Sequence, residues 1–320
     1  MPMEVSARIL GCSTPALAKM VSWKYAHSSA DACCEDLARH HHLKLSKRSI
    51  QHIHHLVASE VIDKEDQWSY PVAFSAEQVA TISISRDGTT APLVGEGYRE
   101  VMTGTISFYD HQGQRLGTLY SGAAPQHGRE VFNHVFGQEI EQVQAQYPHA
   151  SITAVADGDP ANWTFLGQYT KHLTIDYWHA TEYLAGFAHA TMEEQQAKTW
   201  LNERKQVLQQ QEGGAQKVLE EMRTQAGSLS QWTAEHPVRR AVVYFGNHHD
   251  KMGYAQNRKR KIPIGSGIVE AACKTLVKQR MDCSGCRWNY EGMEEVLVTR
   301  SMAMSNRWDD FWSKVDHYGY

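Results

Sequence analysis

IPIGSGIVEAACKTLVKQRM, residues 262–281, has the pattern of a helix that begins near Ser266, a plausible capping residue. Apolar residues recur along it at helical spacing and predict one buried face: Ile268, Val269, Ala272, Cys273, Leu276 and Val277. Its single carboxylate, Glu270, lies one turn into the helix among small and apolar neighbours. Glu270 is either half of a surface pair with Lys274, which contributes only about 0.2–0.5 kcal/mol, or a residue placed for chemistry.

The segments before this helix predict a mixed α/β sheet. Residues 76–85, AEQVATISIS, alternate apolar and polar side chains and predict a strand that ends at the pair Asp87-Gly88. The following segments predict, in order, two strands joined by the turn HQG, a helix, a buried strand that ends at Asp157-Gly158, and a short strand that ends near Asp176: residues 100–110, 114–122, 128–147, 150–156 and 171–176.

Helical patterns lie on both sides of this sheet region. Within residues 1–65, one helix is expected over 29–40 and a second begins after Ser46, with Lys47 and Arg48 in its first turn. Two helices with a tight turn fit a helix-turn-helix that binds DNA, and a small helical bundle without DNA contact fits them equally. Residues 66–320 are expected to form one catalytic domain, with a helical insertion at about 180–262 that includes a helical hairpin broken at Gly213-Gly214.

Composition limits the class of protein. The 320 residues are 42% apolar, which suits a globular fold with a sizeable core, and no apolar run approaches the roughly 20 residues that span a bilayer. We therefore predict a cytoplasmic protein without membrane contact. The net charge of −4 argues against an indiscriminate nucleic-acid binder, but residues 198–290 hold 16 lysines and arginines against 8 acidic residues, including the run NRKRK at 257–261.

Cysteines and histidines suggest no strong metal motif. Six cysteines are too few and too unevenly spaced for a disulfide framework, and the pair Cys283 and Cys286 has no second pair to complete a zinc site. The histidines near Cys33 and Cys34 are expected to lie on exposed helix faces rather than to bind metal: His40, His41, His42, His52, His54 and His55.

Three carboxylates stand out instead. Asp87 and Asp157 each follow a strand, and ligand sites in open α/β sheets favour the carboxyl ends of strands. An Asp-Gly pair alone is an ordinary turn former. Together with Glu270 on the late helix, however, the two aspartates suggest one site for divalent metal, with Asp159 as an alternative ligand at the second strand.

At this level of detail the chain resembles bacterial insertion-sequence transposases of the DDE type, which have a ribonuclease-H-like core and are related to the Mutator-like transposases. The resemblance extends over residues 10–315 and rests on these blocks: ISRDGT, AVADGDPANW, IDYWHATEYL, KIPIGSGIVEAACKTLVKQRM, SGCRW and SNRWDDFW. PIGSGIVEAACK is the most specific of them.

The resemblance implies a ribonuclease-H-like sheet interrupted by a helical insertion, with Asp87, Asp157 and Glu270 as catalytic ligands of two Mg²⁺ or Mn²⁺ ions. The implied activity is metal-dependent cleavage of DNA ends and strand transfer by a nucleoid-associated homo-oligomer, acting on double-stranded element ends and target. The family's Asp-x-x-His element corresponds to Asp176 and His179, which either contact DNA or cap the next helix. Residues expected to contact nucleic acid are Lys47, Arg48, Asp176, His179, Arg258, Lys259, Arg260, Lys261, Lys274, Lys278 and Arg280.

Two other functions fit the same residues. A ribonuclease-H-like nuclease such as a resolvase would share the carboxylates and cleave DNA without joining it. A catalytically inactive DNA-binding protein derived from a transposase would use only the helical N-terminal region and the basic insertion, and would bind DNA in a salt-sensitive way.

Overall fold

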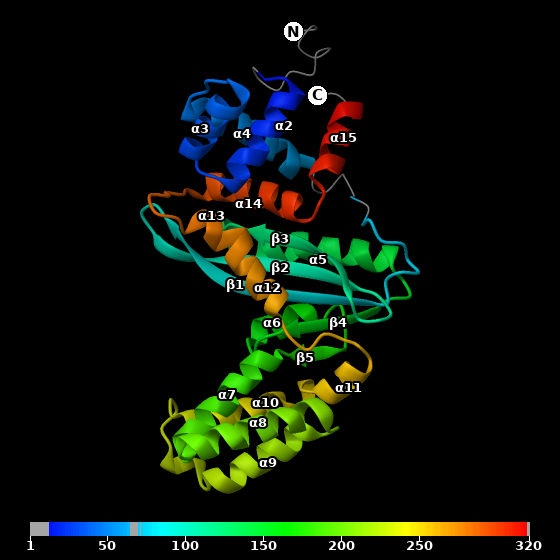
Figure 1. Cartoon of the computed structure of the whole chain (residues 1–320), viewed down its shortest axis with the longest axis vertical. Helices are drawn as coiled ribbons and strands as arrows, with labels where there is room; N and C mark the ends of the chain where they lie inside the picture. The colour runs from blue at the N-terminus through cyan, green and yellow to red at the C-terminus, as the bar shows by residue number, and fades with distance from the viewer. Residues whose placement is uncertain (1–12, 65–69, 71, 319–320) are drawn as a thin grey trace.

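The computed structural model describes residues 13–64, 70 and 72–318, and it is elongated (Figure 1). A helical group formed by both ends of the chain lies at one end, a sheet lies in the middle, and a second helical group lies at the other end. The chain therefore passes from the first helical group into the sheet, out to the second group, and back across the sheet.

The sheet has five strands in the order β3-β2-β1-β4-β5. Its strands are β1 (Thr81–Leu93), β2 (Gly97–Tyr109), β3 (Arg115–Ala123), β4 (Ser151–Ala156) and β5 (Leu173–Ile175). β1, β2 and β3 pair antiparallel, whereas β4 is parallel to both β1 and β5. The predicted mixed sheet is confirmed. Along the chain, three strands are followed by a helix and then by two further strands, as predicted.

One prediction about β1 is wrong. The strand does not end at Asp87-Gly88 but continues to Leu93, and Asp87 pairs with Thr103 of β2 in the middle of the ladder. Antiparallel pairing with β2 holds the backbone extended beyond the point where the local sequence suggests a turn. The actual turn is formed around Gly95 and Gly97, whose φ values of 81° and 73° suit glycine.

Opposite faces of the sheet carry different helices. Ile82 and Ile84 of β1 face α5 (Gly128–Gln146) and α6 (Pro160–Leu166), and they share a core with Phe132 and Phe136. The other face is covered by α12 (Gly267–Ala272), the π-helical segment Cys273–Lys278, α13 (Gln279–Met281) and α14 (Tyr290–Met304) (Figure 1). The period-2 pattern of β1 thus assigns apolar residues to one face and Thr81, Ser83, Ser85 and Asp87 to the other.

The helical group that contains the N-terminal part consists of α2 (Pro15–His27), α3 (Ala30–His41), α4 (Lys47–Lys64) and α15 (Trp308–Tyr318). The predicted helix after Ser29 is confirmed, and Ser29 accepts a hydrogen bond from the Ala32 N–H at 3.2 Å. Phe311 and Trp312 of α15 complete the core between these helices, and α14 contributes Val298 from the sheet side.

The second helical group contains the region expected as an insertion. It consists of α7 (Tyr177–Thr191), α8 (Glu194–Gln210), α9 (Gly214–Ala226), α10 (Pro237–His248) and α11 (Tyr254–Lys259), and it has a core of its own. The predicted hairpin is confirmed as α8 and α9, with Gly213 between them at a φ of 70°. Short 3₁₀ turns occupy Pro125–His127, Leu229–Gln231 and His249–Lys251.

None of the helices within the described ranges combines the length and apolar character that a membrane crossing requires.

Candidate metal centre

Asp87 projects from the middle of β1 towards the helix that carries Glu270. The Sγ of Cys273, in the π-helical segment after α12, donates a hydrogen bond to Asp87 Oδ2 at 3.7 Å. Gly88, the residue after Asp87, lies within β1 and forms no turn, and a Cβ there would lie 2.8 Å from Oε1 of the flexible Glu100 side chain. Asp87 and Gly88 are therefore both residues within a strand, and Glu100 lies close to Gly88.

Asp157 is level with Asp87 across the parallel pair β1 and β4. The register Thr81↔Ser151 to Ile84↔Ala154, continued three residues, brings Asp157 opposite Asp87. Asp157 directly follows the end of β4, and its charge raises the pKa of Asp87, so the two carboxylates lie near each other. Asn162 of α6 donates a hydrogen bond from Nδ2 to Asp157 Oδ1 at 2.8 Å and fixes that carboxylate.

Gly158, which follows Asp157, also has a packing role. A Cβ at Gly158 would lie 2.8 Å from Cε2 of Tyr244 and 3.2 Å from Nε2 of His248. Both residues lie in α10, so the second helical group packs directly against the end of β4. The second Asp-Gly pair, like the first, is not explained by a turn alone.

Asp176 directly follows β5, next to Asp157, and has a structural role. The register Ala156↔Ile175 places Asp176 opposite Asp157. Asp176 is fully buried, and its Oδ1 accepts the His179 N–H at 2.8 Å as the N-cap of α7. Its Oδ2 accepts the Ser266 N–H. The prediction that Asp176 contacts DNA is wrong, because the side chain is fully buried; the capping alternative is confirmed.

The loop before α12 is fastened to β5 and carries Glu270 towards Asp87 and Asp157. The Tyr177 N–H donates to the Ile264 carbonyl at 2.9 Å, and Asp176 holds Ser266 two residues later. Ser266 Oγ then donates to Glu270 Oε1 at 2.9 Å instead of capping α12. These contacts explain how Glu270 reaches Asp87 and Asp157, which lie 183 and 113 positions earlier in the chain.

Glu270 does not pair with Lys274. Its ion-pair contact is His179, whose Nε2 lies 3.6 Å from Glu270 Oε1. The Glu270 side chain is 45% exposed, which leaves an oxygen open to solvent and ligands. The interpretation of Glu270 as half of a surface pair with Lys274 is therefore wrong, because the structure does not form that pair.

Burial and neighbouring negative charge both act on Asp87. Burial raises the pKa of its carboxyl group above the ordinary value, and the charges of Asp157 and Glu270 raise it further. Hydrogen bonds from the Gly88 N–H and from Cys273 oppose this rise. Burial and the Asp87 charge raise the pKa of the Cys273 thiol to about 12, so the thiol is protonated and acts as a donor at neutral pH.

The donor set fits a hard divalent cation. Carboxylate oxygens are the ligands that Mg²⁺ and Mn²⁺ prefer, and among the described residues no lysine or arginine forms an ion pair with Asp87, Asp157 or Glu270. The buried Thr103 hydroxyl, paired with Asp87 across β1 and β2, hydrogen-bonds the Cys273 thiol. A cation with its bound water would compensate the clustered negative charge.

The three predicted ligands do not form the tightest cluster. Where the chain is described, the groups of three ligand atoms within 4.8 Å of one another are Asp176, His179 and Glu270, and a separate group on α4 and α14. Two catalytic ions lie about 3.5–4 Å apart. The ligands of two ions are therefore spread more widely than three ligand atoms that surround a single ion. His179 is close enough to Glu270 to orient its carboxylate.

The predicted DNA contacts on the late helix differ in accessibility. Lys274 and Lys278 are exposed on the helix that carries Glu270. Arg280 is only 4% exposed; its guanidinium lies 4.7 Å from the Trp288 ring centroid and donates to the Tyr25 carbonyl at 3.3 Å. The prediction for Arg280 is wrong, because this residue continues the buried stripe one turn after Val277.

The basic run at 257–261 is exposed, but most of its side chains have partners. Arg258 donates to Gln209 at 2.7 Å and Lys259 pairs with Glu212 at 2.8 Å, which ties α11 to the end of α8 and the loop that follows. Lys261 donates to the His111 carbonyl at 3.1 Å. Arg260 forms no ion pair with a described residue. DNA binding by this run remains a prediction.

Lys47 and Arg48 lie at the exposed start of α4, as expected. Lys47 pairs with Asp31 of α3 at 2.5 Å, which joins the two helices of the predicted helix-turn-helix. The DNA-binding role of this region remains a prediction.

Asp159, the alternative metal ligand, is engaged elsewhere. Its Oδ1 accepts the Ala161 N–H at 2.9 Å as the N-cap of α6, and its Oδ2 pairs with Arg129 at 3.2 Å. These contacts favour Asp157 as the ligand at this strand.

Three supporting residues escaped the sequence analysis. Arg86 is 2% exposed and donates from Nε to Asn162 Oδ1 at 2.7 Å, and Asn162 in turn holds Asp157. Cys273 was assigned only to the buried face of its helix. Arg86 could have been noticed as a charged residue inside an apolar strand, directly before Asp87. No local sequence feature indicates the role of Asn162 or the contact of Cys273 with Asp87.

A scan against protein-family models gives no match for this chain, and a search of curated proteins gives none either.

Proposed function

We propose that this chain is a DNA transposase of the DDE type with a ribonuclease-H-like fold, which cleaves element ends and transfers them to target DNA in a metal-dependent reaction. The observation that carries the proposal is the proximity of Asp87 on β1 to Asp157 directly after the parallel strand β4, together with the arrival of Glu270 from α12. The negative charges of Asp157 and Glu270 both act on Asp87, as expected of ligands that share cations.

In the proposed site, the carboxylates of Asp87, Asp157 and Glu270 would hold two Mg²⁺ or Mn²⁺ ions. When bound, these ions would supply activation of the attacking oxygen and charge stabilisation at the leaving oxygen. Asn162 and His179 orient the carboxylates of Asp157 and Glu270.

DNA reaches this site along an exposed basic surface. Lys274 and Lys278 follow Glu270 at intervals of four residues, so they extend along the same side of the helix and hold backbone phosphates beside the metal centre. The basic run at 257–261 and the first turn of α4 extend the contact to flanking DNA. Reaction on paired ends implies a homo-oligomer at the bacterial nucleoid.

The direct test is a reaction with a plasmid that carries the gene with its native flanking DNA, a second target plasmid, and Mg²⁺ or Mn²⁺. We expect cut ends and joined products from the wild type. We expect neither from Asp87→Asn, Asp157→Asn or Glu270→Gln, because each removes one charged ligand. Asp250→Asn, which changes an exposed acid paired with Lys251, serves as a matched control and keeps activity.

The products also separate the alternatives. Cut ends without joined products identify a nuclease, and salt-sensitive binding without cleavage identifies a DNA-binding protein that has lost catalysis. Full activity in any of the three carboxylate variants would falsify the assignment of that residue.

A further inference from the structure

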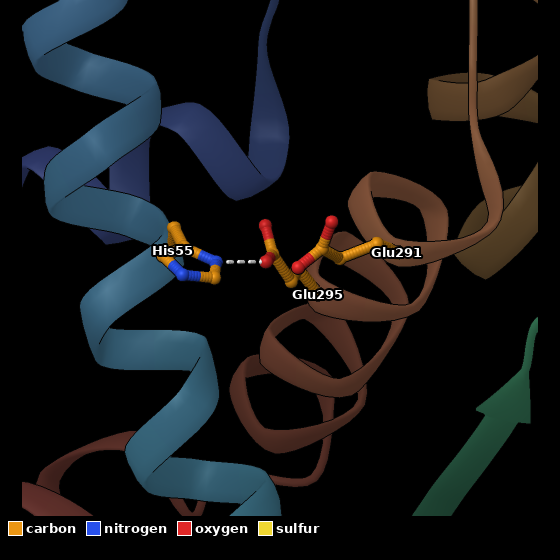
Figure 2. Close-up of side chains that lie close together, drawn as sticks. All are labelled: His55, Glu291 and Glu295. Atoms are coloured by element: carbon orange, nitrogen blue, oxygen red, sulfur yellow. Dashed lines mark hydrogen bonds and ion pairs between the residues drawn. The ribbon is translucent and has the colours of Figure 1, made fainter.

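A second group of ligand-type side chains lies away from the candidate metal centre, between α4 and α14. His55 extends from α4 towards Glu291 and Glu295 on α14, and all three side chains converge in the space between the two helices (Figure 2). One ligand atom from each lies within 4.8 Å of the others. His55 Nδ1 contacts Glu295 Oε1 directly.

The geometry of α14 places both carboxylates on one side. Glu291 and Glu295 are four residues apart, which brings them to the same helix face one turn apart. Glu291 is exposed in the first turn of α14, whereas the Glu295 side chain is only 12% exposed. His55 is 45% exposed at its side chain, so the group opens to solvent on one side.

Charge in this group is not balanced by protein cations. Two carboxylates face one imidazole, and across the described part of the chain neither carboxylate forms an ion pair with a lysine or arginine. Burial raises the pKa of the Glu295 carboxyl group, the His55 contact lowers it, and the Glu291 charge raises it. The hydrogen bond that the His55 ring donates to Glu295 raises the pKa of His55. A protonated His55 carries one positive charge and offsets only one of the two carboxylates. A divalent cation would offset both.

We propose that His55, Glu291 and Glu295 form a binding site for a divalent transition-metal ion, with Zn²⁺ as the favoured ion. Imidazole nitrogen and carboxylate oxygen are both zinc ligands, and a site with three protein ligands keeps a fourth position for water. The nitrogen ligand disfavours Mg²⁺ and Ca²⁺, which select oxygen. This site is therefore distinct in chemistry from the all-carboxylate centre on the sheet.

The ion would join two parts of the molecule. α4 belongs to the helical group at one end, whereas α14 also packs on the sheet through Met293, Val296 and Leu297. A metal bond across this contact fixes the N-terminal helices on the catalytic core, so binding favours the docked state over any state in which α4 has separated from α14. The proposal does not depend on the transposase function.

The test is a titration of the metal-free full chain with Co²⁺, followed by displacement with Zn²⁺. We expect a visible absorption band for one equivalent of Co²⁺ in a low-symmetry nitrogen and oxygen site, and loss of the band when Zn²⁺ is added. We also expect Zn²⁺ to raise the midpoint of thermal unfolding. His55→Ala and Glu291→Gln should lose the band; Glu291 is exposed, so its replacement does not endanger the fold.

Three controls identify the site. His52→Ala changes an exposed histidine one turn earlier on α4, Cys283→Ser removes an exposed thiol, and Asp87→Asn changes the sheet centre; all three should keep the band. Glu291→His, which exchanges one zinc ligand for another, should keep binding as well. Absence of the band from the wild type, or its survival in both His55→Ala and Glu291→Gln, would show that His55 and Glu295 form an ordinary ion pair and would overturn the proposal.

Discussion

Asp176 shows how much of the candidate site depends on one buried carboxylate. Its two oxygens accept backbone N–H groups from α7 and from the loop before α12, so the same side chain caps one helix and fastens the approach to another. Asp176, directly after β5, therefore has a structural role, whereas Asp87 and Asp157 are the proposed metal ligands.

We predict that Asp176→Asn destabilises the protein by about 1–3 kcal/mol, because the new amide nitrogen must face one of two N–H donors in a buried position. Urea unfolding followed by circular dichroism measures the change. Asp250→Asn, at an exposed position, should alter the free energy of unfolding by less than about 0.5 kcal/mol. Equal effects for the two variants would contradict the structural role of Asp176.

Asp87 is expected to reduce stability in the absence of metal. Its pKa in the folded state is raised above the unfolded value of about 3.9, so the folded state holds the proton more tightly and stability falls as the pH rises through the folded pKa. We predict that Asp87→Asn is more stable than the wild type at pH 7 by roughly 0.5–2 kcal/mol.

This difference should shrink as the pH is lowered towards 4, because the wild-type carboxyl group then becomes neutral as well. Thermal or urea unfolding of both proteins without divalent metal, over this pH range, provides the measurement. A variant that is less stable than the wild type at pH 7 would show that Asp87 is stabilised in the folded state, against the direction given by its burial.

At the scale of elements, glycines in β2 and β3 set the distance between the sheet and the helices. A Cβ at Gly104 of β2 would lie 2.7 Å from the Phe136 ring of α5, and one at Gly122 of β3 would lie 2.9 Å from Leu276 on the opposite face. Helices on both faces therefore contact the sheet backbone itself.

We predict that Gly104→Ala costs about 1–3 kcal/mol, since Phe136 has to move within a packed core. Gly253→Ala is a suitable control, because no atom lies within 4 Å of the position of its Cβ and its φ is −75°. Urea midpoints compare the two. A Gly104→Ala protein as stable as the control would mean that α5 can shift away from the sheet without loss.

Local patterns predicted the elements better than their limits. The alternation in ISIS marks β1, and Ser29 marks the start of α3, because both signals are carried by neighbouring residues. The Asp87-Gly88 pair misled, since pairing with β2 extends β1 to Leu93, whereas β4 ends directly before Asp157-Gly158 as predicted. Non-local contacts of this kind leave no local pattern.

Residue type also outweighed position in one case. Arg280 lies three and four residues after Val277 and Leu276, which is the spacing of the buried face, but its charge suggested an exposed position. The rings of Tyr25 and Trp288 accommodate the guanidinium. By contrast, Asp87, Asp157 and Glu270 could be selected from the sequence by their motifs, and the register of β1 with β4 brings the two aspartates near each other.

At the scale of the whole molecule, the proposed DNA surface lies on the helix that crosses the sheet, between the two helical groups (Figure 1). We predict that Lys274→Ala and Lys278→Ala each weaken DNA binding and each reduce the slope of log affinity against log salt by about 0.9, as expected for one lost phosphate contact. Fluorescence anisotropy with duplex DNA at several salt concentrations gives the slopes.

Lys217→Ala is the matched control for this experiment, since Lys217 is an exposed lysine on α9, at the far end of the second helical group (Figure 1). Its slope should equal that of the wild type. Identical slopes for all four proteins would place the DNA on another surface.

The central claim is that three acids, distant in the sequence, bind divalent metal together. Electron paramagnetic resonance of added Mn²⁺ tests it without DNA or turnover. We predict that the wild type binds two magnetically coupled Mn²⁺ ions, and that Asp157→Asn and Glu270→Gln each lose the coupled signal while Glu291→Gln, in the group on α14, retains it. A coupled signal that survives unchanged in both Asp157→Asn and Glu270→Gln would contradict the account.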